Sequence, residues 1–146
     1  MQLIKKSFFI ISIVLCFMNM QCEEDIDDSL EMCDQTTIVS ESMYANMVSD
    51  SFTIISSEIL ENCLAIEISA SGCGGNSWEF NLVDSGAVAE SSPEQRYLKL
   101  QLINNEACLA QFERIITFDL TPLQINGSNE VILHLEGLES LLNYTY

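Results

Sequence analysis

His134 is the only histidine of the chain, so any Ser-His or Cys-His catalytic scheme would have to use it. Glu136 follows two residues later, on the same face of a strand, and could orient the imidazole. The sequence contains no G-x-S-x-G elbow, P-loop, G-x-G-x-x-G or H-E-x-x-H motif. A strand histidine beside an acid is also common in proteins that are not enzymes. We therefore predict no catalytic residues; the alternative is a small envelope hydrolase that uses His134 or a pair of carboxylates.

The spacing of potential metal ligands gives little support to metal or cofactor chemistry. No two cysteines stand at the C-x2-C spacing that zinc sites use, and only one histidine is available. The segment Asp25-Ile26-Asp27-Asp28 lacks the spacing of an EF-hand loop and the glutamate that completes it. The sequence predicts no metal site and no cofactor.

Four of the six cysteines lie beyond residue 22 and form an even set, which predicts disulfides in a small exported domain. If successive strands alternate in direction, the connections that carry Cys73 and Cys108 lie at the same end of the domain. Cys63 begins its strand at the opposite end, where the lead-in that carries Cys33 could fold back. Of the three possible connectivities, we predict Cys73–Cys108 and Cys33–Cys63.

The first 21 residues have the pattern of a secretory signal, with two lysines followed by about a dozen apolar residues. The apolar run ends just before Cys22, and this junction resembles a bacterial lipoprotein signal, in which the cysteine is lipidated. It departs from the usual lipobox, since Gln21 and Asn19 replace a small residue and a leucine. The alternative is ordinary signal-peptidase cleavage, which the absence of a triplet of small residues disfavours. We predict a signal peptide over 1–21 and lipidation of Cys22.

The charge of the chain is strongly acidic, with 22 acidic against 5 basic side chains and a net charge of −17. Removal of residues 1–21 would leave 3 basic against 22 acidic side chains, a side-chain charge of −19. Binding of nucleic acid requires lysines and arginines that neutralise phosphates, so a nucleic-acid partner is excluded.

The acidic run 23–28 directly follows Cys22 and is expected to be a solvated spacer. It also resembles the acidic tether that follows the lipidated cysteine in many Bacteroidetes lipoproteins exported to the cell surface. Asp28-Ser29-Leu30 resembles the short O-glycosylation motif of those bacteria, although a match of three residues is weakly specific.

Short runs of alternating apolar and polar residues begin near residue 50, and such runs are typical of half-buried strands. Turn residues separate seven of these runs, at 51–60, 62–70, 78–82, 97–102, 112–120, 131–136 and 142–146. This pattern predicts an immunoglobulin-like antiparallel β-sandwich over 49–146, with a small β-barrel as the alternative. Residues 22–48 show no sustained period, and we expect an acidic tether and irregular lead-in.

The stretch from residue 62 to 146 resembles small uncharacterised lipoproteins of flavobacteria. The segments that carry this resemblance are 63–73, 84–92, 108–110 and 118–123. The resemblance implies a surface or periplasmic lipoprotein and brings no catalytic residues with it.

These observations together predict an outer-membrane lipoprotein that is held at the cell envelope through Cys22 and is exposed at the cell surface. The alternative is a periplasmic or secreted protein. We expect a structural or binding module whose partners are the membrane, through the N-terminal lipid, and a protein or glycan ligand.

Overall fold

A computed structural model of the chain describes residues 33–146. The predicted signal peptide, Cys22, the acidic run 23–28 and the Asp28-Ser29-Leu30 motif lie outside these residues. Among residues 33–146, no helix is long and apolar enough to cross a membrane.

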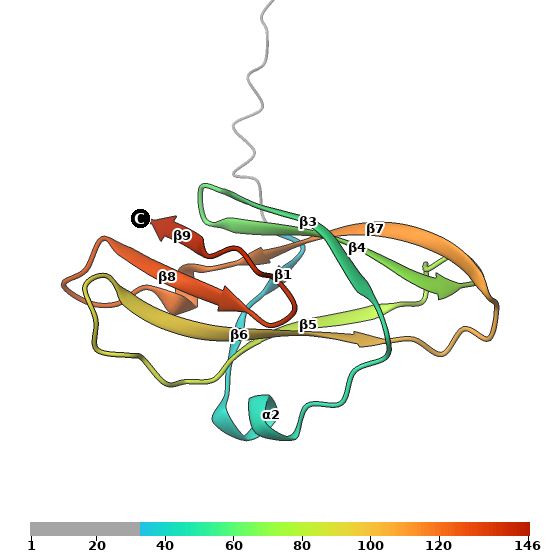
Figure 1. Cartoon of the computed structure of the whole chain (residues 1–146), viewed down its shortest axis with the longest axis horizontal. Helices are drawn as coiled ribbons and strands as arrows, with labels where there is room; N and C mark the ends of the chain where they lie inside the picture. Colours follow the sequence, from blue (N-terminus) through green and yellow to red (C-terminus); the bar gives the residue numbers. More distant parts are fainter. Residues whose placement is uncertain (1–32) are drawn as a thin grey trace, which may run out of the picture. The chain divides into compact units, whose positions relative to one another are not determined.

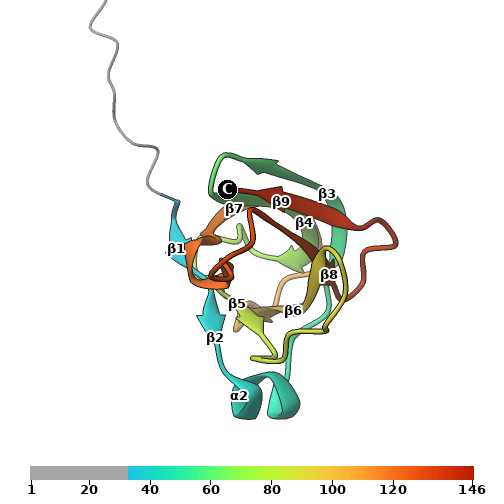
Figure 2. The ribbon, with the colours of Figure 1, turned by 90° about the vertical axis from the view of Figure 1, so that its left-hand side faces the viewer.

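Nine strands of the described part form two sheets, which face each other as the layers of a β-sandwich (Figures 1 and 2). One sheet has the order β1(Gln35–Thr36), β7(Ala110–Asp119), β4(Cys63–Gly72), β3(Thr53–Leu60). The other has the order β2(Ile38–Val39), β5(Glu79–Asp84), β6(Glu94–Ile103), β8(Glu130–Leu135), β9(Leu142–Thr145). The sandwich prediction is therefore confirmed, and each of the seven expected strands corresponds to one of β3 to β9.

The sheets are mixed rather than antiparallel throughout, which refines the predicted architecture. The parallel pairs are β1 with β7, β2 with β5, and β6 with β8. β6 and β8 are parallel because the chain crosses to the other sheet between them. β7 lies in the sheet that contains β4, and after it the chain re-enters the sheet of β6, where β8 runs in the same direction as β6.

The two sheets bury a shared apolar core. In β4 the side chains alternate strictly, and Leu64, Ile66 and Ile68 point inward with no exposed surface. Trp78 and Phe80 both belong to this core, and their rings make an edge contact with centroids 6.4 Å apart. Burial of each such side chain stabilises the fold by about 1.5–3 kcal/mol.

The lead-in is more ordered than the sequence analysis expects, because residues 35–46 contain two short strands and a helix. β1 pairs with one sheet and β2 with the other, so the chain crosses between the sheets at Thr37. The helix α2(Glu41–Asn46) begins after Ser40, whose Oγ accepts a hydrogen bond from the Met43 N–H at 3.2 Å. A serine in this position is a usual N-cap of a helix.

One ion pair is buried inside the sandwich, between the carboxylate of Asp84 and the guanidinium of Arg96 at 3.5 Å. Asp84 is fully buried, and its Oδ1 also accepts a hydrogen bond from the Gly86 N–H at 2.8 Å. Burial raises the pKa of Asp84, while the Gly86 N–H and Arg96 oppose the rise. Substitution of either partner alone would strongly lower the stability of the fold, because it would leave an unpaired buried charge.

Both cysteine pairs are joined in the structure. Cys33–Cys63 connects the lead-in to the start of β4, with Cα atoms 5.7 Å apart. Cys73–Cys108 connects the loop after β4 to the loop before β7, with Cα atoms 4.8 Å apart. Each disulfide therefore links segments that are distant in sequence and adjacent in the fold.

We expect the double variant Cys73→Ala/Cys108→Ala to lower the free energy of unfolding by about 3–4 kcal/mol, since a closed loop restricts the unfolded chain. The sequence separations of 35 and 30 residues give Cys33→Ala/Cys63→Ala a loss of similar size. Urea denaturation of the three proteins measures both losses. Four free thiols in the unfolded, unreduced wild-type domain would contradict the prediction.

Candidate binding groove

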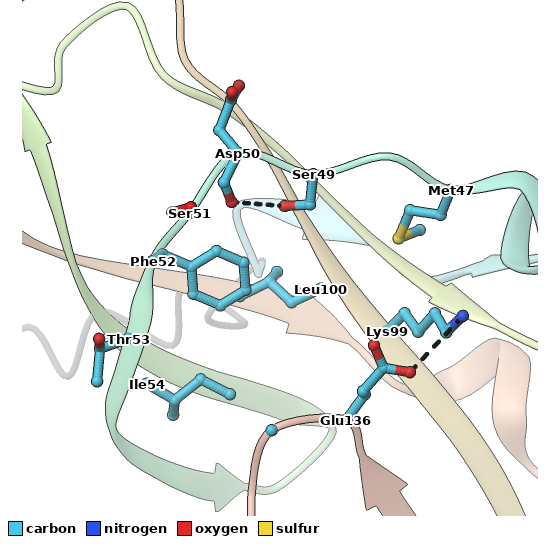
Figure 3. A pocket seen from close by; sticks show the side chains of 11 residues that line it. Met47, Ser49, Asp50, Ser51, Phe52, Thr53, Ile54, Lys99, Leu100 and Glu136 are labelled. Carbon is cyan, nitrogen blue, oxygen red and sulfur yellow. Dashed lines mark hydrogen bonds and ion pairs between the residues drawn. The ribbon is translucent and has the colours of Figure 1, made fainter.

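A groove of about 530 Å³ opens where the chain passes from α2 into β3 (Figure 3). Its walls come from the 47–54 segment, from the middle of β6 and from the turn after β8. The lining residues are Met47, residues 49–54, Lys99, Leu100, Glu136 and Gly137. Apolar surface from Phe52, Ile54 and Leu100 is thus combined with charged and hydroxyl groups.

Hydrogen bonds to β6 fix the wall formed by residues 48–50. The Asp50 N–H donates to the Leu102 carbonyl at 2.9 Å, and the Ser49 hydroxyl accepts from the Leu102 N–H at 2.9 Å. The Gln101 side-chain amide donates to the Val48 carbonyl at 2.6 Å. This wall is therefore attached to the sheet before the chain enters β3.

An ion pair lies at the side of the groove that faces α2. The Lys99 ammonium lies 3.6 Å from the Glu136 carboxylate, and it donates to the Tyr44 carbonyl at 3.3 Å. It also lies 4.4 Å from the centre of the Tyr44 ring, within the range of a cation–π contact. Burial, with the nearby Glu136 carboxylate as the next cause, raises the pKa of Tyr44. Lys99 is thus held in place, whereas the Glu136 side chain remains 68% exposed.

His134 and Glu136 do not form the arrangement that the sequence suggests. The His134 ring stacks on Tyr97, with centroids 4.8 Å apart, and its Nε2 is hydrogen-bonded to Gln95 Oε1 at 2.6 Å. β8 ends at Leu135, and the Glu136 carboxylate contacts Lys99 instead of the imidazole. Glu136 lines the groove and His134 does not.

A second polar cluster lies in the loop after β4, where one carboxylate accepts hydrogen bonds from a glycine-rich segment. The N–H groups of Cys73, Gly74 and Gly75 all donate to Glu106 Oε2, at 2.5, 3.0 and 3.1 Å. The Ser77 hydroxyl donates to Glu106 Oε1 at 2.7 Å. Consecutive N–H groups that converge on an anion form a nest, and here the chain's own carboxylate occupies it.

These donors, the Ser77 hydroxyl most strongly, lower the pKa of Glu106 from 4.5 to about 2. A depressed pKa of the folded state means that the unfolded chain binds the proton first as the pH falls. The stability that Glu106 contributes is therefore complete above pH about 4.5 and is lost towards pH about 2.

We expect Glu106→Gln to lower the urea midpoint at pH 7, and the variant and the wild type to converge as the pH falls to about 2. Glu113→Gln, an exposed change on β7, is the matched control and should leave the pH profile unchanged. Urea denaturation at several pH values measures the difference. A constant gap between Glu106→Gln and wild type at every pH would refute the role given to this carboxylate.

Neither the groove nor the nest provides a recognisable metal centre. Within the described residues, no three His, Cys, Asp or Glu side chains gather closely enough to hold a metal ion. Sequence reasoning identified Glu136 but not Phe52, Lys99 or Tyr44 as members of one site. These residues come from distant segments and have no common motif, so no local signal could have grouped them.

The chain forms a disulfide-linked β-sandwich with a groove on its surface. No family model matches the chain, and no curated protein matches it. A NigD-like immunity protein from Bacteroides caccae has a similar crystal structure, with TM-score 0.55 and 10% identity. The match covers 76% of this chain and 64% of that one.

Two further crystal structures are similar. A toxin-related protein from Parabacteroides distasonis matches with TM-score 0.50 and 16% identity over 77% of this chain and 59% of its own. A DUF1344 protein of unknown function from Bacteroides vulgatus matches with TM-score 0.49 and 12% identity over 77% and 54%. The chain thus spans less than two thirds of each of these proteins. At this level of identity the comparisons establish the fold alone.

Proposed function

We propose that the protein is a lipid-anchored binding module of the cell envelope, and that the groove between the 47–54 segment and β6 is its ligand site. The groove is the observation that carries this proposal. It combines the apolar side chains of Phe52 and Ile54 with the Lys99–Glu136 ion pair, and its wall is attached by hydrogen bonds. A concave site with apolar surface and a few placed polar groups is typical of ligand binding.

The arrangement around His134 gives no support to the alternative of an envelope hydrolase. Its imidazole stacks on Tyr97 and is hydrogen-bonded to Gln95, and the carboxylate of Glu136 is paired with Lys99. The fold is shared with a NigD-like immunity protein, and an immunity-type binding role is one form that the proposed function could take.

The membrane anchor of this proposal is the lipidated Cys22, followed by the acidic spacer 23–28. An outer-membrane lipoprotein exposed at the cell surface would place the groove within reach of extracellular and envelope ligands. The proteins that share the fold come from Bacteroides and Parabacteroides, and this origin agrees with the resemblance of the N-terminal segment to Bacteroidetes lipoproteins.

We expect Cys22→Ala to move the protein from the membrane fraction to the soluble fraction, because the acyl chains supply its membrane affinity. Cys16→Ala changes a cysteine within the predicted signal and should leave the protein in the membrane fraction. Fractionation of cells that express each protein, followed by immunoblotting, measures the distribution. A Cys22→Ala variant that stays in the membrane fraction would refute the anchor.

We expect Phe52→Ala to reduce the binding of the domain to detergent-solubilised outer membrane of the host by about tenfold, as for loss of a central aromatic contact. Leu109→Ala is the matched control, since Leu109 is an exposed apolar residue next to β7 outside the groove. Titration of each immobilised variant with the solubilised material gives the apparent affinities. Equal binding by the wild type and Phe52→Ala would show that the groove is not the ligand site.

A further inference from the structure

The outer face of the sheet in which β7, β4 and β3 lie side by side contains a shallow apolar hollow (Figure 1). Alternate residues of β4 point into the core, so Ala65 and Glu67 lie on the outer face. The hollow has a volume of about 380 Å³ and shares no lining residue with the groove. Its walls include apolar side chains of three strands and a disulfide, namely Leu60, Ala65, Ile115 and Cys33–Cys63.

Two large apolar side chains of this hollow are exposed to solvent. Ile115 on β7 is 65% exposed, and Leu60 at the end of β3 is 50% exposed. Strand residues on the solvent face of a sheet are usually polar, because contact of apolar surface with water costs free energy. Apolar side chains that gather on an exposed face are typical of an interaction surface.

Three glutamates border the hollow on the same face. In the strand register Glu58 lies opposite Ala65, and Glu67 lies opposite Ile115. Glu113 stands two residues before Ile115 on β7 and therefore points to the same side. Side chains that are directly opposite on neighbouring strands have Cβ atoms about 4.5–5.5 Å apart, so these carboxylates lie beside the apolar surface.

No basic side chain of residues 33–146 offsets these carboxylates. Arg96 is buried in its ion pair, and Lys99 lies at the groove. Arg114 points the other way and donates to the Gly74 carbonyl at 2.7 Å. Neither Glu58, Glu67 nor Glu113 has an ion-pair partner within the described residues. The hollow and its border thus combine exposed apolar surface with negative charge that has no counter-charge in the fold.

This charge distinguishes among the occupants that could cover the surface. The lead-in just before Cys33 carries six acidic side chains and no basic one over residues 23–32. A second copy of the chain would present the same acidic face. Juxtaposed like charges are unfavourable across an interface, whereas a basic surface supplies the opposite charge. The net charge of −17 would also attract a basic partner over long distances.

We propose that the outer face of β3, β4 and β7 binds a basic protein. The partner inserts an apolar side chain between Leu60 and Ile115, and its lysines or arginines contact Glu58, Glu67 and Glu113. An apolar centre with a charged rim is the usual anatomy of a protein interface, and the charges contribute specificity and fast association. This surface is separate from the groove, so the inference goes beyond the proposed function.

The probe is a random library of disulfide-cyclised dodecapeptides displayed on phage and selected on the purified protein. We expect one family of peptides in which an apolar residue is flanked by lysines or arginines. The affinity of the synthetic peptides should fall about tenfold in the triple variant Glu58→Gln/Glu67→Gln/Glu113→Gln, since three charge pairs are lost. Leu60→Ser should also weaken binding about tenfold, since the apolar contact is lost.

The matched control is Glu79→Gln/Glu90→Gln/Glu139→Gln, which removes three exposed carboxylates from other parts of the surface. It should leave the affinity within about twofold, because general attraction by the acidic chain is screened by salt at long range. Phe52→Ala should also leave it within about twofold, so a failure of the groove proposal does not affect this result. Urea midpoints equal to that of the wild type show that each variant is folded.

Several outcomes would overturn the inference. If no basic peptide family is selected, or if both triple variants weaken binding equally, this face is not a specific site. An affinity raised about tenfold by Leu30→Ser/Met32→Ser would show that the lead-in of the chain covers the surface. A dimer in sedimentation velocity that Ile115→Lys dissociates would show that a second copy covers it.

Discussion

Backbone hydrogen bonds along both sides of β6 organise the sheet to which it belongs and the groove beside it. β5 pairs with one side of β6, while β8 and then residues 49–50 pair with the other. Residues 49–50 hydrogen-bond to Leu102, so the chain runs along the end of β6 on its way from α2 to β3. That path builds one wall of the groove, and the end of β8 builds the opposite wall.

The two sheets are held together in complementary ways. Apolar side chains from both sheets meet in the core, and the disulfides fix the lead-in and the loops beside β4. The buried Asp84–Arg96 pair adds a polar constraint at the end of β5, where the chain turns at Gly86. Desolvation of such a pair costs free energy, which the apolar core offsets, so the pair is better understood as fixing this region than as the source of its stability.

The backbone groups at the Glu106 nest and at the groove differ in their surroundings. Backbone N–H groups converge on the Glu106 carboxylate and are thereby used within the fold. At Leu100, by contrast, the backbone faces a groove with apolar and charged walls. The Lys99–Tyr44 contact keeps the α2 side of this site in place.

The alternation of apolar and polar residues was enough to predict the sandwich, since period-2 segments such as β4 leave one apolar face that must be buried. It also pointed to the two cysteine pairs, because alternating strand directions bring Cys73 and Cys108 to the same end. The lead-in strands β1 and β2 were missed, since two-residue strands carry no periodicity. The contact of Glu136 with Lys99 rather than His134, and the groove shared by Phe52, Lys99 and Leu100, arise from the packing of segments that are distant in the sequence. Those neighbours follow from how the chain crosses between the sheets, and local sequence patterns do not encode such crossings.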